Sequence, residues 1–416
     1  MGDPRIGFYG DDVTGSVDVL LQFARTGAQG RLFVGTPETS ALVAAAAECS
    51  VVGIAGIARS LPTDQLEEEI APALRALRAI DPDIVQYKAC STADSSPNFG
   101  SLGRVLEIGR DIFGAATVPM LFAQPDFGRY TVFGHHFAAE GDRIHRLDRQ
   151  PTMANHPSTP MTESDLAVHL SHQTALPVGA LHVTEYASAS AIAQRVLDSR
   201  DAAVVLDALD DAHLALLGDA LRRLARPLFM IGSGGLSRAI GLARTTDSIA
   251  LTGSIRARGP VLVVSGSRSP QTRRQAAAAA AAGWVVRPLP SLVDDDAVAD
   301  VVRVLRSERS LVLTSDDTTL DGDALAAIAR SAASMITGAV QAGVTSRIIV
   351  CGGDTSSRVV RMLGIQSLSL AANPEGNVVL LRAHSDDPSI DGLEVLLKGG
   401  QVGADDLFVK IAGDRA

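Results

Sequence analysis

Two segments near the N-terminus carry residues that could bind or activate a small polar substrate. The first, residues 10–15, reads Gly-Asp-Asp-Val-Thr-Gly and directly follows a short apolar run. Of its adjacent carboxylates, Asp11 and Asp12, one can cap a following helix while the other faces a ligand. In the alternative interpretation both residues are helix caps or turn formers, and their position alone favours neither reading.

The second segment, Tyr87–Ser96, sets a cation beside several hydroxyls and a carboxylate. A sugar acid needs a positive group for its carboxylate and hydrogen-bond partners for its hydroxyls. Lys88 ends an apolar run, where a lysine requires a partner. We therefore favour a binding site over a serine-rich capping loop. The residues that we expect to contact a ligand here are Lys88, Ser91, Thr92, Asp94 and Ser95.

A third region, Phe127–Pro160, is polar and shows no clear period, as is typical of functional or disordered segments. Two of its residues, Arg129 and His156, are further candidates for substrate contacts. The arginines that flank Asp148 could form a surface ion network of little energetic value, or they could clamp an acidic substrate. The histidines of this region show no spacing typical of metal ligands, so we expect no metal site.

Three loops of small residues in the C-terminal half predict a nucleotide site. Glycine lets backbone N–H groups approach phosphates, and Ser or Thr hydroxyls add donors. Each loop alone reads as an ordinary strand-to-helix turn, and none matches the P-loop or the dinucleotide fingerprint. Three such loops in one domain make a phosphate site the better interpretation. The candidates are Ser265, Gly266, Ser267, Gly352, Gly353, Asp354, Thr355, Ser356, Gly400 and Gly403.

Short apolar runs that alternate with helical patterns must position these residues. The alternation predicts βαβ units, and so an α/β fold whose sheets are mostly parallel and flanked by helices. A loosely patterned stretch, Thr245–Gly259, divides the chain into two predicted domains, 1–250 and 251–416. The predicted strands are 5–9, 31–34, 51–58, 84–88, 118–123, 179–184, 203–207, 228–232, 261–264, 284–288, 310–314 and 347–351. The predicted helices are 16–27, 64–80, 272–282 and 324–342. Residues 373–377 read as a turn.

Composition narrows the class of protein. The 37 Lys and Arg residues against 47 Asp and Glu give a net charge of −10, which argues against a general nucleic-acid binder. A local pocket can still be basic. Three scattered cysteines imply no disulfide framework. We find no signal-peptide pattern and no apolar run of about 18 residues. The expectation is a cytoplasmic protein with no membrane partner.

Taken together, these motifs resemble the four-carbon acid sugar kinase family over nearly the whole chain. The N-terminal motifs are residues 11–15, 88–96 and 156–161; the C-terminal ones are 265–267, 352–356 and 398–400. The resemblance implies an N-terminal domain for the sugar acid and a C-terminal domain for ATP, with the active site in the cleft between them. Members phosphorylate threonate, erythronate and their 3-oxo forms. The implied substrate contacts are Asp12, Arg59, Lys88 and Ser91–Ser96, and the implied ATP contacts are Ser267, Gly353–Ser356 and Gly400.

The chain departs from the family pattern in three places. Ser357 stands where the nucleotide loop often has glycine, and residues 398–401 read Lys-Gly-Gly-Gln in place of Lys-Ser-Gly-Asn. Both changes keep small or polar residues, so ATP binding is still expected. Residues 146–149 differ from the threonate and erythronate kinases. They look more like the branch that includes kinases of the branched acid 3-oxo-isoapionate.

These observations suggest a mechanism as a hypothesis. Asp12 would accept the proton of the substrate hydroxyl, and Lys88 and Arg59 would bind the carboxylate. Mg²⁺ would bridge two phosphates of ATP, with Asp354 as a water-mediated partner. A non-catalytic sugar-acid-binding protein and a dinucleotide-dependent oxidoreductase are the alternatives from other classes. The glycine loops argue against the first and the missing fingerprint against the second. A homodimer is expected on base rates alone.

Overall fold

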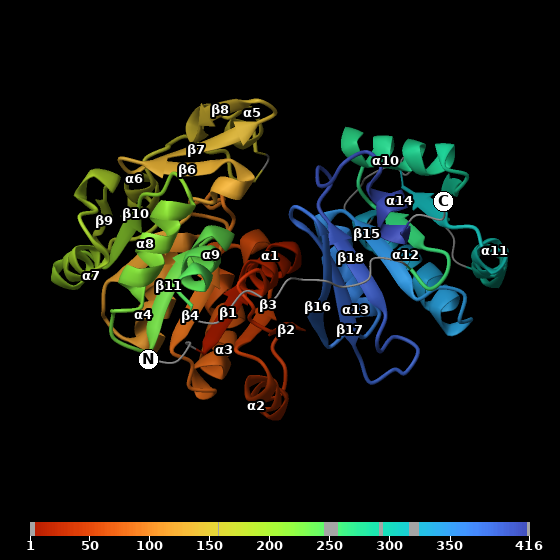
Figure 1. Cartoon of the computed structure of the whole chain (residues 1–416), viewed down its shortest axis with the longest axis horizontal. Coiled ribbons are helices and arrows are strands. Elements are labelled where there is room, and N and C mark those ends of the chain that lie inside the picture. Colours follow the sequence, from red (N-terminus) through yellow and green to blue (C-terminus); the bar gives the residue numbers. More distant parts are fainter. Residues whose placement is uncertain (1–4, 157, 245–256, 291–293, 316–323, 414–416) are drawn as a thin grey trace. The chain divides into compact units, whose positions relative to one another are not determined.

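The computed structural model describes residues 5–156, 158–244, 257–290, 294–315 and 324–413. The chain forms two compact units, Met1–Arg31 with Gly35–Ala250 and Leu32–Val34 with Leu251–Ala416. Each unit is a mostly parallel sheet with helices packed on it (Figure 1), which confirms the predicted α/β class. The predicted boundary after residue 250 lies outside the described residues. The cleft between the domains stays a prediction.

The N-terminal unit is built on a parallel sheet. Its order is β3 (Val51–Ala55), β1 (Ile6–Gly10), β4 (Ile84–Lys88), β11 (Leu228–Gly232), β5 (Val118–Leu121), β10 (Ala203–Leu206) and β9 (Val178–Leu181). Every residue of β1, β3, β4 and β11 is buried. Continuous apolar strands of this kind require helices on both faces of a parallel sheet.

The helices of this unit pack in two groups. In one group α1 (Val13–Ala24) packs on α9 (Gly234–Leu242), α9 on α8 (Asp211–Leu221) and α8 on α7 (Ala189–Asp198). In the other, α3 (Leu66–Ala79) packs on α4 (Leu102–Phe113), and α4 contacts α6 (Leu166–Ser171). Helix α2 (Thr39–Glu48) packs beside β3.

The prediction that residues 127–160 are irregular is wrong. They contain an antiparallel sheet of β6 (Arg129–Val132), β7 (His135–Glu140) and β8 (Arg143–Arg146), followed by the short helix α5 (Pro151–Ala154). Ala138 packs against Leu147, Met153 and Met161 in a small core. On β7, the fully buried residues are His136 and Ala138. Because a histidine and an alanine mark the buried face, the strand shows no apolar alternation.

The C-terminal unit has a sheet that is parallel at one end and antiparallel at the other. Five parallel strands come first, in the order β13 (Val285–Pro288), β14 (Leu311–Thr314), β12 (Leu262–Ser265), β15 (Arg347–Cys351) and β18 (Glu394–Lys398). The antiparallel strands β17 (Val378–His384) and β16 (Ser367–Glu375) follow. The predicted turn at 373–377 is thus confined to Gly376 and Asn377, because β16 runs on to Glu375.

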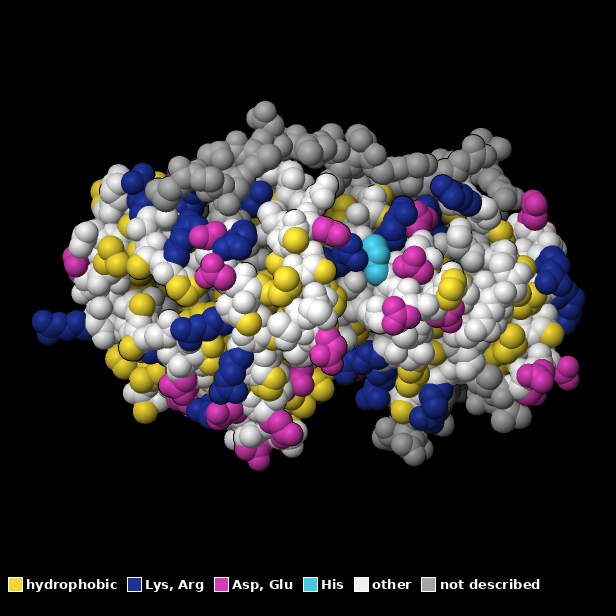
Figure 2. All heavy atoms as spheres, turned by 90° about the horizontal axis from the view of Figure 1, so that it is seen from below, with side chains coloured by type: hydrophobic (Ala, Val, Ile, Leu, Met, Phe, Trp, Pro, Cys, Tyr) yellow, Lys and Arg dark blue, Asp and Glu magenta, His cyan; other side chains and the backbone are white. Residues whose placement is uncertain are grey.

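Helices α10 (Pro270–Ala281), α11 (Asp295–Arg306), α12 (Ala324–Gln341), α13 (Gly353–Met362) and α14 (Leu407–Ala412) complete this unit. Residues Leu32–Val34 of strand β2 (Gly30–Val34) also belong to this C-terminal unit. The Val34 N–H donates to the Gln366 carbonyl at 3.0 Å. Within the described residues no helix is long and apolar enough to span a membrane. Acidic and basic side chains are interspersed on the face seen in Figure 2.

Candidate functional site

The strand ends of the N-terminal sheet bring the candidate residues together. Gly10, the last residue of β1, pairs with Lys88 at the end of β4, which pairs with Gly232 at the end of β11. Gly232 in turn pairs with Leu121, the last residue of β5. Since the strands are parallel, the loops that follow them emerge at one edge of the sheet, where ligands of open α/β sheets bind.

Asp12 caps helix α1. Its backbone is extended, and its carboxylate accepts hydrogen bonds from the Gly15 N–H at 2.6 Å and the Thr14 hydroxyl at 2.8 Å. The helix therefore begins at Val13, three residues before the predicted start. The cap orients the Asp12 carboxylate at the helix N-terminus, where the helix dipole stabilises negative charge.

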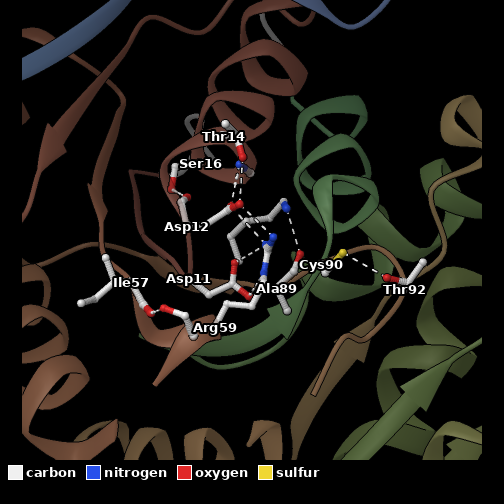
Figure 3. Close-up of polar contacts among 12 residues, drawn as sticks. Asp11, Asp12, Thr14, Ser16, Ile57, Arg59, Ala89, Cys90 and Thr92 are labelled. Carbon is white, nitrogen blue, oxygen red and sulfur yellow. Dashed lines mark hydrogen bonds and ion pairs between the residues drawn. The ribbon is translucent and has the colours of Figure 1, made fainter. Parts of the chain in front are cut away.

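Arg59 joins both carboxylates (Figure 3). Its Nε and Nη2 donate to Asp11 at 3.1 and 2.6 Å, and its Nη1 and Nη2 donate to Asp12 at 2.8 and 3.1 Å. The side chain of Asp11 is 3% exposed and that of Asp12 is 23% exposed. Asp12 is thus the carboxylate that a substrate can reach, while Asp11 anchors the guanidinium from beneath.

The two carboxyl groups respond differently to this environment. Burial raises the pKa of Asp11, against the opposing effect of the Arg59 charge. Burial also acts to raise the pKa of Asp12, but the charges of Arg59 and Lys88 and the hydrogen bonds from Thr14 and Gly15 outweigh it. The pKa of Asp12 is therefore lowered, and its carboxylate is ionised at neutral pH.

Lys88 lies close enough to this cluster for its charge to favour the ionised forms of Asp11 and Asp12. Its side chain is buried, and its Nζ donates to the Ala89 carbonyl at 2.8 Å. A Cβ added to Gly15 would lie 2.4 Å from Asp12 Oδ1 and 3.2 Å from Lys88 Nζ. Glycine is required at this position because the carboxylate and the ammonium group approach the backbone so closely.

Two residues at the same edge were not predicted from the sequence. Asp18, on α1, accepts a hydrogen bond from Gln124 Nε2 at 3.0 Å. Burial raises the pKa of Asp18, although Lys88 favours its ionised form. Asp18 lies one helical turn after Gly15, so an earlier helix start would have placed it on this face. Gln124 follows a strand that only the sheet order brings beside β11.

The loop after β4 is held by side chains from the antiparallel sheet and the chain that follows it. His136 Nε2 donates to the Ser91 carbonyl at 2.8 Å, and burial lowers the pKa of this histidine to about 3, so the ring is neutral. The Thr159 hydroxyl donates to Asp94. His156 Nδ1 lies 3.9 Å from the same carboxylate, so His156 is next to the predicted Asp94.

Two other residues of this loop, Thr92 and Ser95, are buried. Thr92 Oγ1 lies 3.1 Å from Cys90 Sγ, beside the Arg59 cluster in Figure 3. The hydroxyl of Ser95 lies 3.0 Å from both His169 Nε2 and Gln173 Nε2 and is buried. Ser95 therefore stabilises the loop. The arginine pair around Asp148 is a surface feature, since Arg146 binds Asp148 bidentately at 2.6 Å and is 40% exposed.

In the C-terminal unit the three predicted loops meet at the ends of neighbouring strands. Ser265 pairs with Cys351, and Cys351 pairs with Lys398. A Cβ on Gly266 would lie 2.0 Å from Thr355 Oγ1, and one on Gly400 would lie 2.7 Å from Ser267 Oγ. The loops can approach one another this closely only because both positions are glycine.

Helix α13 begins at this junction without a side-chain cap. Gly352 occupies the cap position with φ 109° and ψ 127°, and no side chain of the described residues caps the first turn. Such N–H groups bind anions. Gly353 and Asp354 are exposed there, and a Cβ on Gly353 would contact nothing within 4 Å. Space and donors for a phosphate group are thus present together.

The remaining loop residues hold this arrangement in place. Ser265 Oγ accepts from the Ser267 N–H at 3.2 Å, and the Ser356 hydroxyl donates to the Val350 carbonyl at 3.3 Å. The Gly403 carbonyl accepts from Gln271 Nε2 at 2.8 Å. Lys398 was not among the predicted site residues, although it begins one of the three loops. Its side chain is buried, and its Nζ donates to Thr272 Oγ1 at 3.0 Å. In the described part of the chain, no His, Cys, Asp and Glu side chains gather in groups that could hold a metal.

Replacing Arg59 with methionine should destabilise the protein by about 3 kcal/mol, because it leaves the buried Asp11 carboxylate without its partner. Arg104→Met is the matched control. Arg104 also contacts two carboxylates, Glu67 and Glu107, but this site is more exposed and its loss should cost about 1 kcal/mol or less. The midpoints of urea unfolding compare the two variants. Equal shifts would contradict the special role of Arg59.

Comparisons with known proteins find relatives along the whole chain. A family model described as a sugar-binding N-terminal domain matches residues 6–240, and a nucleotide-binding C-terminal domain matches residues 262–408. A 3-oxo-isoapionate kinase from Paraburkholderia graminis is 34% identical over 96% of this chain and 92% of its own length. A 3-oxo-tetronate kinase from Pseudomonas fluorescens is 30% identical over 99% of this chain and 97% of its own.

Solved structures share the fold. A Salmonella typhimurium LT2 protein, whose description names a tRNA synthase, matches with TM-score 0.81 and 23% identity, covering 100% of this chain and 99% of that one. A Haemophilus influenzae protein matches with TM-score 0.74 and 22% identity, covering 98% and 99%. At these identities the likeness concerns the fold alone. On the matches of both domain models and of the full-length relatives, the chain belongs to the four-carbon acid sugar kinase family.

Proposed function

We propose that the protein is an ATP-dependent kinase that phosphorylates a hydroxyl group of a short sugar acid. The observation that carries this proposal is the uncapped start of α13, where three loops of Gly, Ser and Thr converge. The N-terminal unit adds an accessible carboxylate, Asp12, beside Arg59 and Lys88. Because the relatives act on 3-oxo-isoapionate and 3-oxo-tetronate, a 3-oxo acid is the first substrate to test.

Each unit has a distinct part in this reaction. Asp12 accepts the proton of the attacking hydroxyl. Lys88 stabilises the negative charge that develops on the oxygen of this hydroxyl. In the C-terminal unit, Ser267, Gly353 and Gly400 hold the phosphates of ATP. Phosphoryl transfer depends on positioning and charge neutralisation more than on covalent help. ATP would supply the phosphoryl group, and the exposed Asp354 would help to hold Mg²⁺ through water, which would neutralise charge on the phosphates.

A coupled ADP-release assay with Mg-ATP tests the proposal. The panel is 3-oxo-isoapionate, 3-oxo-tetronate, D-threonate and D-erythronate, with buffer alone as the control for ATP hydrolysis. We expect turnover on at least one acid. Calorimetry with ATP is run beside the assay. Absence of both turnover and ATP binding would contradict the kinase and favour a non-catalytic sugar-acid-binding protein.

A further inference from the structure

Three cations, Arg59, Lys88 and Arg129, lie near the carboxyl ends of the strands of the N-terminal sheet, which we call the substrate edge. They differ in how nearby carboxylates compensate their charges. Arg59 pairs with Asp11 and Asp12. Lys88 shares its charge with the same carboxylates and with Asp18, whose ionised forms it favours. Arg129 donates only to backbone carbonyls, and within the described chain no carboxylate lies within 4.0 Å of its guanidinium. Arg129 is therefore the cation with the least compensation.

The unused atoms of Arg129 have a defined geometry. Its Nη1 donates to the carbonyls of Phe127 at 2.8 Å, Gly128 at 3.4 Å and Ala139 at 3.2 Å. Its Nε is buried without a hydrogen-bond partner, and its Nη2 makes no hydrogen bond to a described residue. The Nε–Nη2 edge is one of the edges by which arginine binds a carboxylate through two parallel hydrogen bonds. Because buried donors are normally satisfied, this edge indicates a missing anionic partner.

Arg129 is connected to both parts of the substrate edge. Its backbone pairs with Gln124 through hydrogen bonds of 2.9 and 3.1 Å, and the Gln124 side chain donates to Asp18. Its charge also acts on His136, which donates to the Ser91 carbonyl. Arg129 thus lies between the helix that carries Asp12 and Asp18 and the loop that carries the predicted hydroxyl groups.

We propose that Arg129 binds the carboxylate of the sugar acid through its Nε–Nη2 edge. The inference rests on the proposed function and replaces the assignment of this carboxylate to Arg59 and Lys88. A carboxylate placed beside Arg59 would face the negative charges of Asp11 and Asp12 at the same guanidinium. At Arg129 the charge of Glu140 acts on the guanidinium from a greater distance, and no described carboxylate forms an ion pair with it. Lys88 and Asp12 then act on the hydroxyl end of the substrate.

The variant Arg129→Met tests this assignment. The probe is the acid of the panel with the highest kcat/KM, compared with its primary amide, which lacks the charge. Loss of a charge-assisted bidentate contact should raise KM for the acid by roughly 10- to 100-fold. KM for the amide should change little, so the preference for the acid disappears. KM for ATP should stay within about twofold of the wild type, because the phosphates bind elsewhere.

Arg110→Met is the matched control. Arg110 also holds backbone carbonyls, those of Ala116 at 2.6 Å and Ala202 at 3.1 Å, and it forms no ion pair with a described residue. This variant should keep the wild-type preference for the acid. If Arg129→Met does not fold, Arg129→Lys replaces it. Lysine keeps the positive charge but cannot donate two parallel hydrogen bonds to a carboxylate, so we expect a smaller but measurable rise in KM for the acid.

Two results would overturn the assignment. One is an unchanged preference for the acid over the amide in the Arg129 variants. The other is a rise in KM for ATP in place of the acid, which would mean that the free edge binds a phosphoryl group. Failure of the proposed function is seen separately, as absence of turnover in the wild-type protein with every acid of the panel.

Discussion

Replacing Asp12 with asparagine should lower kcat by at least about 100-fold and leave KM for ATP unchanged. Asparagine caps helices about as well as aspartate, so the contact with the Gly15 N–H is kept and the fold with it. What is lost is the negative charge that accepts the proton. Since the pKa of Asp12 is lowered, the wild-type kcat should show no loss from this group between pH 7 and about 5.

The neighbouring carboxylates provide controls for this variant. Asp11→Asn removes a buried charge that is paired with Arg59. Its main effect should be a lower urea midpoint, and its kcat should fall less than that of Asp12→Asn. Asp18→Asn removes another carboxylate from the same edge, where the amides of Gln22 and Gln124 already donate to it. If Asp18→Asn shows the 100-fold loss and Asp12→Asn does not, Asp18 is the proton acceptor.

Replacing Gly352 with alanine should raise KM for ATP at least about tenfold. The backbone of Gly352, at φ 109° and ψ 127°, is in a region that L residues rarely adopt. The new Cβ would also lie 3.4 Å from the Ser267 N atom and from Thr355 Oγ1. Relief of this strain has to move the first turn of α13 or the Ser267 loop. Steady-state kinetics with ATP as the varied substrate measure the effect.

Gly364→Ala is the control at the other end of the same helix. Gly364 has φ 67°, and its Cβ would contact nothing within 4 Å. Its replacement should cost about 1 kcal/mol of stability through backbone strain, with KM for ATP unchanged. Equal changes of KM in the two variants would show that the Gly352 effect comes from lost stability and that this loop does not hold the phosphates.

Local sequence patterns were sufficient wherever a strand is continuously apolar and ends at a polar or glycine residue. The predicted bounds of β4, β11 and β15 agree with the structure, and nine of the candidate residues lie in the segments that follow β4 and β15. The antiparallel sheet at 129–146 was missed. Its strands are only partly buried, and the buried residues of β7 are polar or small. The sequence of β7 therefore shows no alternation of apolar and polar residues.

The residue types that could do chemistry were visible in the sequence alone: the carboxylates at 11 and 12, the lysine at 88 and the glycine loops after β12 and β15. Only the tertiary structure decided how their charges are distributed. Sheet order places the end of β5 beside β11, more than 100 residues away in sequence, and so brings Gln124 to Asp18. The fold also gives Arg59 two carboxylate partners, whereas Arg129 forms no ion pair with any described residue. Ion pairing depends on distances of a few ångströms between distant segments, and no local pattern contains that information.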